Sequence, residues 1–382
     1  MSPIGELRQF FTHYSCHSGI RALRVKKVPT LLQPCVSVAP KGCPRVEFIP
    51  IDRPSANNLY PITADHILAM CRRAFGSGIQ VVSARELSGG TFNRTFLITL
   101  FDRRVILRIA PPATAEVAWH EQQLMRREHH IQPFFAAVAP LMPRVLLADF
   151  IHQVIDCDYV FQSFIEGERW EDMAESFTME ENEQLWEQFG HIARTIHDTT
   201  GTSFGGPYPM PEFPTWSQTI LDRFERVTSA MDHVQLDMTD LQSLFTIVQD
   251  HITTLDEVQQ PRLLHGDLWL FNILIERSVA GPNIVGILDA DRAWWGDPLA
   301  DWTMFVLAKW SSPENRPFHD RFWRGYGEVE ETPGTAFRQA VYEAMHVGTA
   351  LEWAIRNHDD DTVERGKRDL SAVAANLMDL IR

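Results

Sequence analysis

The stretch Leu264-His265-Gly266-Asp267-Leu268-Trp269-Leu270-Phe271-Asn272 reads as an apolar strand end, a tight turn that exposes Asp267, and a new strand that begins at Asn272. The chain then turns back through Gly281-Pro282 into a second strand near Ile284–Asp289. Antiparallel pairing of the two strands would bring Asp289 beside Asn272. We therefore expect Asp267, Asn272 and Asp289 to face one crevice.

These three residue types, in this order, suit one kind of chemistry. Phosphoryl transfer needs a carboxylate that orients the attacking hydroxyl and accepts its proton. It also needs oxygen ligands for Mg²⁺, which an amide and a second carboxylate supply. Each piece alone is also typical of ordinary turns and strand ends, so the prediction depends on all three occurring in order.

The residues before this site predict a small sheet-rich unit. A helix from Thr63 to Phe75 is followed by strands at Ile79–Leu87, Phe92–Phe101 and Arg104–Ala110, because β-branched and aromatic residues alternate with short polar turns. We expect a helix at Ala115–His129 and two further strands. These strands lie near Val145–Phe150 and Tyr159–Phe164.

The residues after Gly167 are mostly helical in pattern. Thr178 and Glu181 form a capping box ahead of apolar residues at helical spacing. Further helices are expected at Met238–Leu255, Ala300–Trp310, Phe337–Arg356 and Thr362–Leu380. We interpret the tryptophans at 294, 295, 302 and 310 as core, and His197 as a buried structural histidine. The fold class is α+β.

Together these motifs resemble the aminoglycoside phosphotransferases and their relatives, which share the protein-kinase-like fold. The likeness rests on His265-Gly266-Asp267 with Asn272, on Ile287-Leu288-Asp289, and on Gly296-Asp297-Pro298-Leu299-Ala300-Asp301. It implies two lobes, a small antiparallel-sheet N-lobe and a larger helical C-lobe. It implies Asp267 as the base and Asn272 and Asp289 as Mg²⁺ ligands. His265 and Asp301 would support the catalytic loop.

The resemblance also implies an ATP or GTP site in the N-lobe. Ser88-Gly89-Gly90 would let backbone N–H groups approach phosphates. Arg108, on the third strand, would bind the phosphates and pair with Glu121, with Glu128 and Glu116 as alternatives. Nucleotide-base recognition falls to the hinge, Gln162, Ser163 and Phe164.

Composition limits the remaining functions. Residues 1–60 contain eight Lys/Arg and three Asp/Glu, so the acidic charge of the chain, −15 overall, lies in the remainder. We expect residues 1–58 to form a flexible basic extension, 59–166 the N-lobe and 167–382 the C-lobe. An acidic body argues against nucleic-acid binding, and no apolar run is long enough to span a membrane.

The scattered cysteines predict a reducing cytoplasm. A zinc site is not expected, because there is no Cys-x-x-Cys pair among His13, Cys16, His17, Cys35 and Cys43. We expect a monomer or weak homodimer.

The predicted activity is transfer of a nucleotide γ-phosphate to a hydroxyl of a small molecule. Asp289 and Asp297 are only eight positions apart, which leaves no long activation segment for a peptide substrate. An aminoglycoside or another antibiotic, with a role in antibiotic resistance, is one possible acceptor. A fructosamine, choline or homoserine is an alternative. A non-catalytic nucleotide-binding protein and a protein kinase also remain open.

Overall fold

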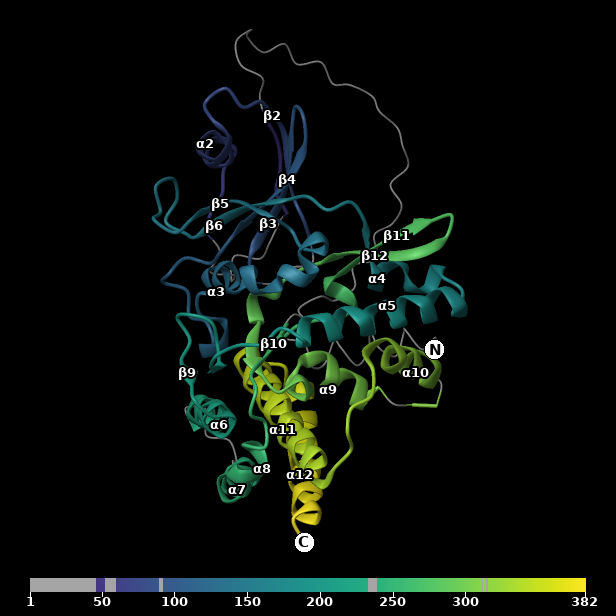
Figure 1. Ribbon diagram of the computed structural model, residues 1–382. Coiled ribbons are helices and arrows are strands. Elements are labelled where there is room, and N and C mark those ends of the chain that lie inside the picture. Colours follow the sequence, from purple (N-terminus) through teal and green to yellow (C-terminus); the bar gives the residue numbers. More distant parts are fainter. Residues whose placement is uncertain (1–45, 52–59, 89–91, 233–238, 311, 314) are drawn as a thin grey trace. The chain divides into compact units, whose positions relative to one another are not determined.

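The computed structural model describes residues 46–51, 60–88, 92–232, 239–310, 312–313 and 315–382. Within these residues the chain forms two compact units (Figure 1). The smaller unit combines the described part of 17–115 with 144–164, and the larger unit combines 116–143 with 165–382. Each unit has its own hydrophobic core.

The smaller unit is a six-stranded sheet with one long helix. The sheet order is β1-β2-β3-β4-β6-β5, and only the edge pair of β1 and β2 is parallel. The strands are β1 (Glu47–Ile49), β2 (Val81–Glu86), β3 (Arg94–Leu100), β4 (Arg104–Ile109), β5 (Val145–Asp149) and β6 (Tyr159–Ser163). Three of the five strands expected from the sequence, β2, β3 and β4, thus pair as a meander, and β6 lies between β4 and β5.

Helix α2 (Ala64–Phe75) has the ends that its sequence predicts. The Thr63 hydroxyl accepts a hydrogen bond from the His66 N–H, and Gly76 ends the helix at φ +95°. Its buried face, with Ile67, packs into the core of the smaller unit.

Two expectations for this region are wrong in part. Residues 1–58 were expected to form a flexible extension, but Glu47–Ile49 within it pairs with β2. The helix expected at Ala115–His129 is interrupted, because Gln123 adopts a left-handed backbone with φ +53°. A 3₁₀ turn at Trp119–Glu121 precedes this break, and helix α3 (Leu124–Ile131) follows it.

The larger unit is mostly helical. Its helices are α4 (Trp170–Met173), α5 (Met179–His197), α6 (Trp216–Asp232), α7 (Thr239–Asp250), α8 (Ile252–Leu255), α9 (Trp302–Lys309), α10 (Arg316–Tyr326), α11 (Pro333–Arg356) and α12 (Asp360–Leu380). Short strands form two small sheets: β7 (Glu168–Arg169) with β11 (Ile273–Ser278) and β12 (Gly281–Ile287), and β8 (Phe204–Gly205) with β9 (Glu212–Phe213), β10 (Arg262–Leu264) and β13 (Trp294–Gly296). Further 3₁₀ turns occupy Gln132–Leu141, Ala174–Ser176, Leu270–Asn272, Ala290–Arg292 and Pro298–Ala300.

Helix α5 anchors the larger unit. Thr178 and Glu181 form the predicted capping box at its start, and α10 packs along it (Figure 1). The two helices approach closely at Gly190 and Gly325, where an added Cβ would lie 2.1 Å from the Phe322 carbonyl oxygen and 2.0 Å from the Glu187 carbonyl oxygen, respectively. Small residues at both positions are therefore a condition of this packing.

The remaining expectations agree with this architecture. The α+β class is confirmed, and the four tryptophans interpreted as core are all buried. The helix expected at Met238–Leu255 is divided into α7 and α8, whereas those at Ala300–Trp310, Phe337–Arg356 and Thr362–Leu380 correspond to α9, α11 and α12. None of the described helices is both long and apolar enough to cross a bilayer.

Candidate active site

The loop that carries Asp267 is shaped by the glycine before it. Strand β10 ends at Leu264, and Gly266 then adopts φ +77°, a conformation that favours glycine. A Cβ at Gly266 would lie 2.2 Å from the Arg292 carbonyl oxygen. The loop thus turns sharply against the segment that follows Asp289.

Asn272 and Asp267 lie in direct contact. The Asn272 Nδ2 donates to the Asp267 backbone carbonyl (2.8 Å) and to the Asp267 Oδ2 (2.9 Å). Both side chains are buried, with exposed fractions of 7% and 5%. Asn272 itself ends a 3₁₀ turn, one residue before the strand that was expected to start there.

The hairpin of β11 and β12 brings Asp289 to the same end of this small sheet as Asn272. Ile273 pairs with Ile287, and the Leu288 N–H donates to the Asn272 carbonyl at 2.8 Å. Asp289 then adopts φ +58° and ψ +54°, a left-handed conformation that is uncommon for a residue with a side chain. Such local strain is found preferentially at functional sites.

Asp301 joins the loop to the following helix. Its two carboxylate oxygens accept hydrogen bonds from the His265 N–H (3.0 Å) and the Gly266 N–H (2.8 Å), and the Trp302 N–H adds a third at the start of α9. The same carboxylate lies 2.9 Å from His197 Nε2, whose Nδ1 lies 2.8 Å from the Tyr326 hydroxyl. Asp301 therefore stabilises the loop that carries Asp267 and also acts as the N-cap of α9.

Burial alters the protonation of the loop residues. It raises the pKa of the Asp267 carboxyl well above its usual range, with Asp291 and Asp289 adding to the increase and Arg292 opposing it. Burial also lowers the pKa of His265 to about 4, so that this ring is neutral at pH 7. For Asp301, burial opposes ionisation, but the bonds from His197 and Gly266 hold its pKa below the usual value.

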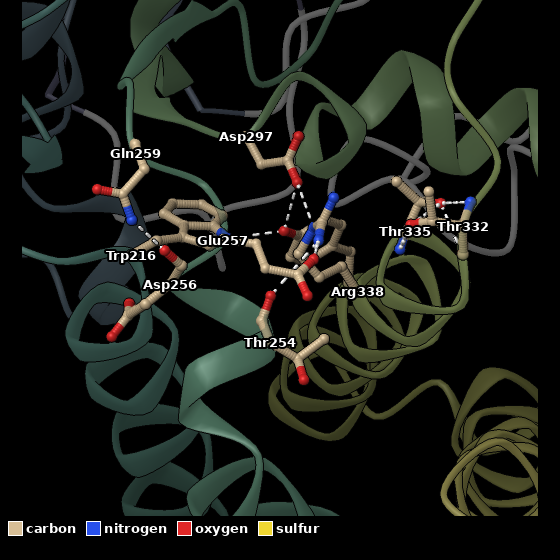
Figure 2. A network of polar contacts seen from close by, with 10 residues as sticks. Trp216, Thr254, Asp256, Glu257, Gln259, Asp297, Thr332, Thr335 and Arg338 are labelled. Carbon is tan, nitrogen blue, oxygen red and sulfur yellow. Dashed lines mark hydrogen bonds and ion pairs between the residues drawn. The ribbon is translucent and has the colours of Figure 1, made fainter.

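A second buried network supports the segment between Asp289 and Asp301. Figure 2 shows Asp297 beside Arg338, whose Nε lies 3.1 Å from the Asp297 Oδ2. The Tyr342 hydroxyl donates to the same oxygen at 2.7 Å and accepts from the Trp216 Nε1 at 2.6 Å. Arg338 also contacts Glu257. This network links α6, α11 and the segment after α8 to Asp297.

The donor chemistry of Asn272 and Asp289 fits Mg²⁺. Both bonds of the Asn272 amide use its nitrogen, so its Oδ1 is directed away from Asp267. Mg²⁺ is usually bound by one or two protein carboxylates together with substrate phosphates and water, and not by an all-protein cage. The described residues contain no group of three His, Cys, Asp or Glu suited to hold a metal ion.

The residues predicted to bind the nucleotide belong mostly to the smaller unit. Arg108 lies on β4, opposite Thr95 and Val160, and is 7% exposed. Of the predicted glycine loop, Ser88 is described, whereas Gly89 and Gly90 lie outside the described residues.

The hinge prediction falls at the end of β6. Gln162 is a buried strand residue, and the Ser163 Oγ accepts from the Arg144 N–H at 2.9 Å. The Arg104 guanidinium lies 4.3 Å from the centre of the Phe164 ring.

Glu121 belongs to the larger unit, as do its alternatives Glu116 and Glu128. It accepts from the Ala118 N–H and lies 3.8 Å from the Arg292 guanidinium. Its predicted pairing with Arg108 stays a prediction.

Sequence reasoning missed several residues that shape the site. Thr303 donates from its hydroxyl to the Leu268 carbonyl at 2.6 Å, and the charge of Arg292 acts on Asp267. The position of Arg292, three residues after Asp289, was the one available signal. The contact of Thr303 depends on how α9 meets the loop, which local sequence does not encode.

Comparison with known proteins gives one family and several relatives. A family model described as "Phosphotransferase enzyme family" matches residues 83–340. A probable ketoamine kinase of Klebsiella pneumoniae is 30% identical over 139 residues, which cover 33% of this chain and 98% of that protein. Acyl-CoA dehydrogenase family member 10 of Mus musculus is 23% identical over 247 residues, 62% of this chain. The chain spans only about a fifth (21%) of the length of the mouse protein.

Among solved structures, a thermostable mutant of aminoglycoside phosphotransferase APH(4)-Ia, in ternary complex with ADP and hygromycin B, is similar to this chain. The TM-score is 0.59 at 16% identity, and the match covers 81% of this chain and 98% of that one. This likeness confirms the predicted kinase-like fold.

Proposed function

Because the chain belongs to the phosphotransferase enzyme family, we propose that it transfers the γ-phosphoryl group of ATP or GTP to a hydroxyl of a small molecule. The observation that carries the proposal is the hydrogen bond from the Asn272 side chain to the Asp267 carboxylate. The Asn272 carbonyl in turn accepts from the N–H of Leu288, the residue before Asp289. The ADP complex of the similar solved structure supports a nucleotide as donor.

In the proposed reaction Asp267 accepts the proton of the acceptor hydroxyl. The acceptor oxygen forms a bond to the γ-phosphorus as the bond from that phosphorus to the β,γ-bridging oxygen breaks, which leaves ADP or GDP. Burial favours this role, because a carboxylate with a raised pKa is a stronger base once ionised. Asn272 orients the Asp267 carboxylate, and Asp301 holds the backbone of the loop.

Asn272 and Asp289 would hold Mg²⁺, which when bound neutralises charge on the phosphate oxygens. Arg108 is proposed to bind the phosphates, with Ser88 and the glycines beside it contributing backbone N–H groups. The hinge residues Gln162 to Phe164 would contact the nucleotide base. Glu121 is the proposed partner of Arg108.

Two acceptor classes have support from relatives. One is an aminoglycoside, since the similar solved structure holds hygromycin B. The other is a ketoamine, since nearly the whole length of a probable ketoamine kinase matches part of this chain. Under the first, antibiotic resistance would be the biological role.

A coupled assay of nucleotide consumption tests the proposal over a panel of aminoglycosides, ketoamines, amino alcohols and sugars. We expect Mg²⁺-dependent consumption with at least one acceptor, and its loss in Asp267→Ala while nucleotide binding is retained. If the affinity for nucleotide is the same with and without Mg²⁺, and no acceptor is phosphorylated, the protein is instead a non-catalytic nucleotide-binding protein.

A further inference from the structure

A row of guanidinium groups extends from the site through the larger unit. Arg292, whose carbonyl oxygen lies against Gly266, is in the 3₁₀ turn that packs on α3, and Arg127 is on α3. The charge of Arg127 acts on Arg223, which is on α6. Arg226, one turn further along α6, completes the row. These four residues are here called the arginine row.

Two indole rings flank the outer part of this row. The Arg223 guanidinium lies 3.6 Å from the ring centre of Trp294 and 6.0 Å from that of Trp119. Trp294 pairs across the small sheet with Leu264, three residues before Asp267. The Trp294 contact therefore fixes Arg223 near the strand that delivers the proposed base.

The charge of Arg223 is poorly compensated. Its sequence neighbour Asp222 binds the Arg226 Nε at 2.7 Å, and within the described residues no ion pair involves Arg223. Burial lowers the pKa of Arg223 to about 9, the charges of Arg127 and Arg226 act in the same direction, and Asp222 opposes them. The guanidinium stays protonated at pH 7, so an anion beside it would be favoured.

Arg127 gives an independent sign of an incomplete site. It is only 4% exposed, and its Nη1 donates to the His120 carbonyl at 2.8 Å. Its buried Nε has no hydrogen-bond partner among the residues that the structure describes. Asp291 is the acidic group that acts on it. A buried donor without an acceptor is destabilising, so an acceptor oxygen in contact with this nitrogen would be favoured.

The row remains within reach of a ligand. Arg223 and Trp119 are partly exposed, and the Arg226 side chain is 36% exposed. Planar guanidinium groups bind carboxylate and phosphate through two parallel hydrogen bonds. Three neighbouring guanidinium groups repel a polycation.

We propose that the phosphate acceptor is an anionic hydroxyl compound, whose carboxylate or phosphate group is bound by Arg223 next to Arg127 and Arg226. The inference rests on the proposed function, because it names the substrate class of that same site. It favours acidic acceptors, including ketoamines that carry a carboxylate, over aminoglycosides. Arg223 acts as a specificity-determining residue that holds the end of the acceptor remote from the reacting hydroxyl.

Matched acceptors test this directly with the full-length chain. One pair is a ketoamine with and without a carboxylate on its amine, and the other is a sugar with and without a phosphate ester. The two pairs distinguish carboxylate from phosphate recognition. We expect kcat/KM to be at least about 10-fold higher for the anionic member of one pair, as a charged hydrogen bond implies. Kanamycin is included as a polycationic acceptor, for which we expect a lower kcat/KM than for the anionic acceptors.

Three variants separate recognition from folding. Arg223→Gln should reduce the anionic preference to within about 3-fold, mainly through KM, and Arg223→Lys should retain part of it. Arg277→Gln is the control, because Arg277 also stacks on a ring in the larger unit, at 4.5 Å from Phe177. This control should leave the preference unchanged.

Several results would overturn the inference while leaving phosphotransfer intact. One is a kcat/KM for the neutral acceptors or for kanamycin that equals or exceeds the value for the anionic acceptors. Another is a preference for the anionic acceptors that is unchanged in Arg223→Gln. A purely structural Arg223 would lower the unfolding temperature without altering the preference. If no acceptor is phosphorylated, calorimetric binding of the same pairs decides. Binding that depends on the anion and on Arg223 supports the inference although the proposed function fails, and its absence refutes both.

Discussion

In the proposed mechanism Asn272 has two roles, because its amide nitrogen binds Asp267 and its amide oxygen is the proposed metal ligand. Its nitrogen is bound to Asp267, which fixes the direction of its oxygen. A change at this residue should therefore affect base orientation and metal affinity together.

Replacing Asn272 with Ala should lower kcat by about 10- to 1,000-fold and raise the Mg²⁺ concentration needed for half-maximal activity, because one ligand oxygen is lost. A magnesium titration of steady-state turnover measures both effects. Asn283→Ala is a suitable control, since Asn283 is an exposed asparagine on the same hairpin. Equal Mg²⁺ dependence in wild type and Asn272→Ala would show that Asn272 is not a ligand.

At this scale the sequence predicts those residues of the candidate site whose type and spacing are themselves the signal. Asp267, Asn272, Asp289 and Asp301 have side chains with a distinctive chemistry at fixed intervals. Arg223 could not be identified in this way, because its proposed role depends on its contact with Trp294. Trp294 is 71 positions away in the sequence and contacts Arg223 only in the folded chain.

Among the elements, the contact between α5 and α10 has the least tolerance for added volume. Gly325→Ala would place a Cβ 2.0 Å from the Glu187 carbonyl oxygen, so the helices would have to separate. We expect a loss of about 2–4 kcal/mol in the free energy of unfolding, measured by urea denaturation. Gly78→Ala, where a Cβ meets nothing within 4 Å, should be neutral. Equal stability of both variants would refute the close packing.

A buried carboxylate links α2 to the sheet of the smaller unit. Asp149, at the end of β5, accepts from Arg73 Nε (2.7 Å), the Tyr159 hydroxyl (2.9 Å) and the Ile151 N–H (3.0 Å). Burial alone would raise the pKa of Asp149, but these three bonds hold it below its usual value. Because the folded pKa is depressed, the stabilisation is present above the unfolded pKa of about 4 and is lost as pH falls through the folded value.

Asp149→Asn should therefore destabilise the protein by about 1–3 kcal/mol at pH 7, and the difference from wild type should shrink below about pH 4. Thermal unfolding of both proteins across this pH range measures it. Asp102→Asn, at an exposed ion pair with Arg103, should show little effect at any pH. A pH-independent difference for Asp149→Asn would contradict the account.

Local pattern predicted most elements and failed where tertiary contacts decide. Thr63 and Thr178 predict helix starts because their hydroxyls can cap backbone N–H groups, and Gly76 predicts a helix end because glycine tolerates a positive φ. The break at Gln123 has no such signature, since glutamine is not specialised for a left-handed backbone. Strand β1 is three residues long and forms only because β2 is available beside it. Helix α6 was overlooked although Trp216, Ile220, Phe224, Val227 and Met231 recur at helical spacing.

At the scale of the whole molecule, the family match at residues 83–340 includes parts of both units. The smaller unit contains Arg108, and the larger contains Asp267. The chain is acidic overall, at −15, which makes the arginine row a local exception. The arrangement of charge in the larger unit, and not the net charge of the chain, is the basis for the proposed anionic acceptor.

The central claim is that Asp267 serves as the base for phosphoryl transfer to a small molecule. The most direct measurement is ³¹P NMR of the reaction mixture, which follows the acceptor phosphate ester as it forms from ATP and Mg²⁺. Wild type should form the ester, and Asp267→Asn, correctly folded and still able to bind nucleotide, should form it at least about 100-fold more slowly. Ester formation at the wild-type rate by Asp267→Asn would contradict the account.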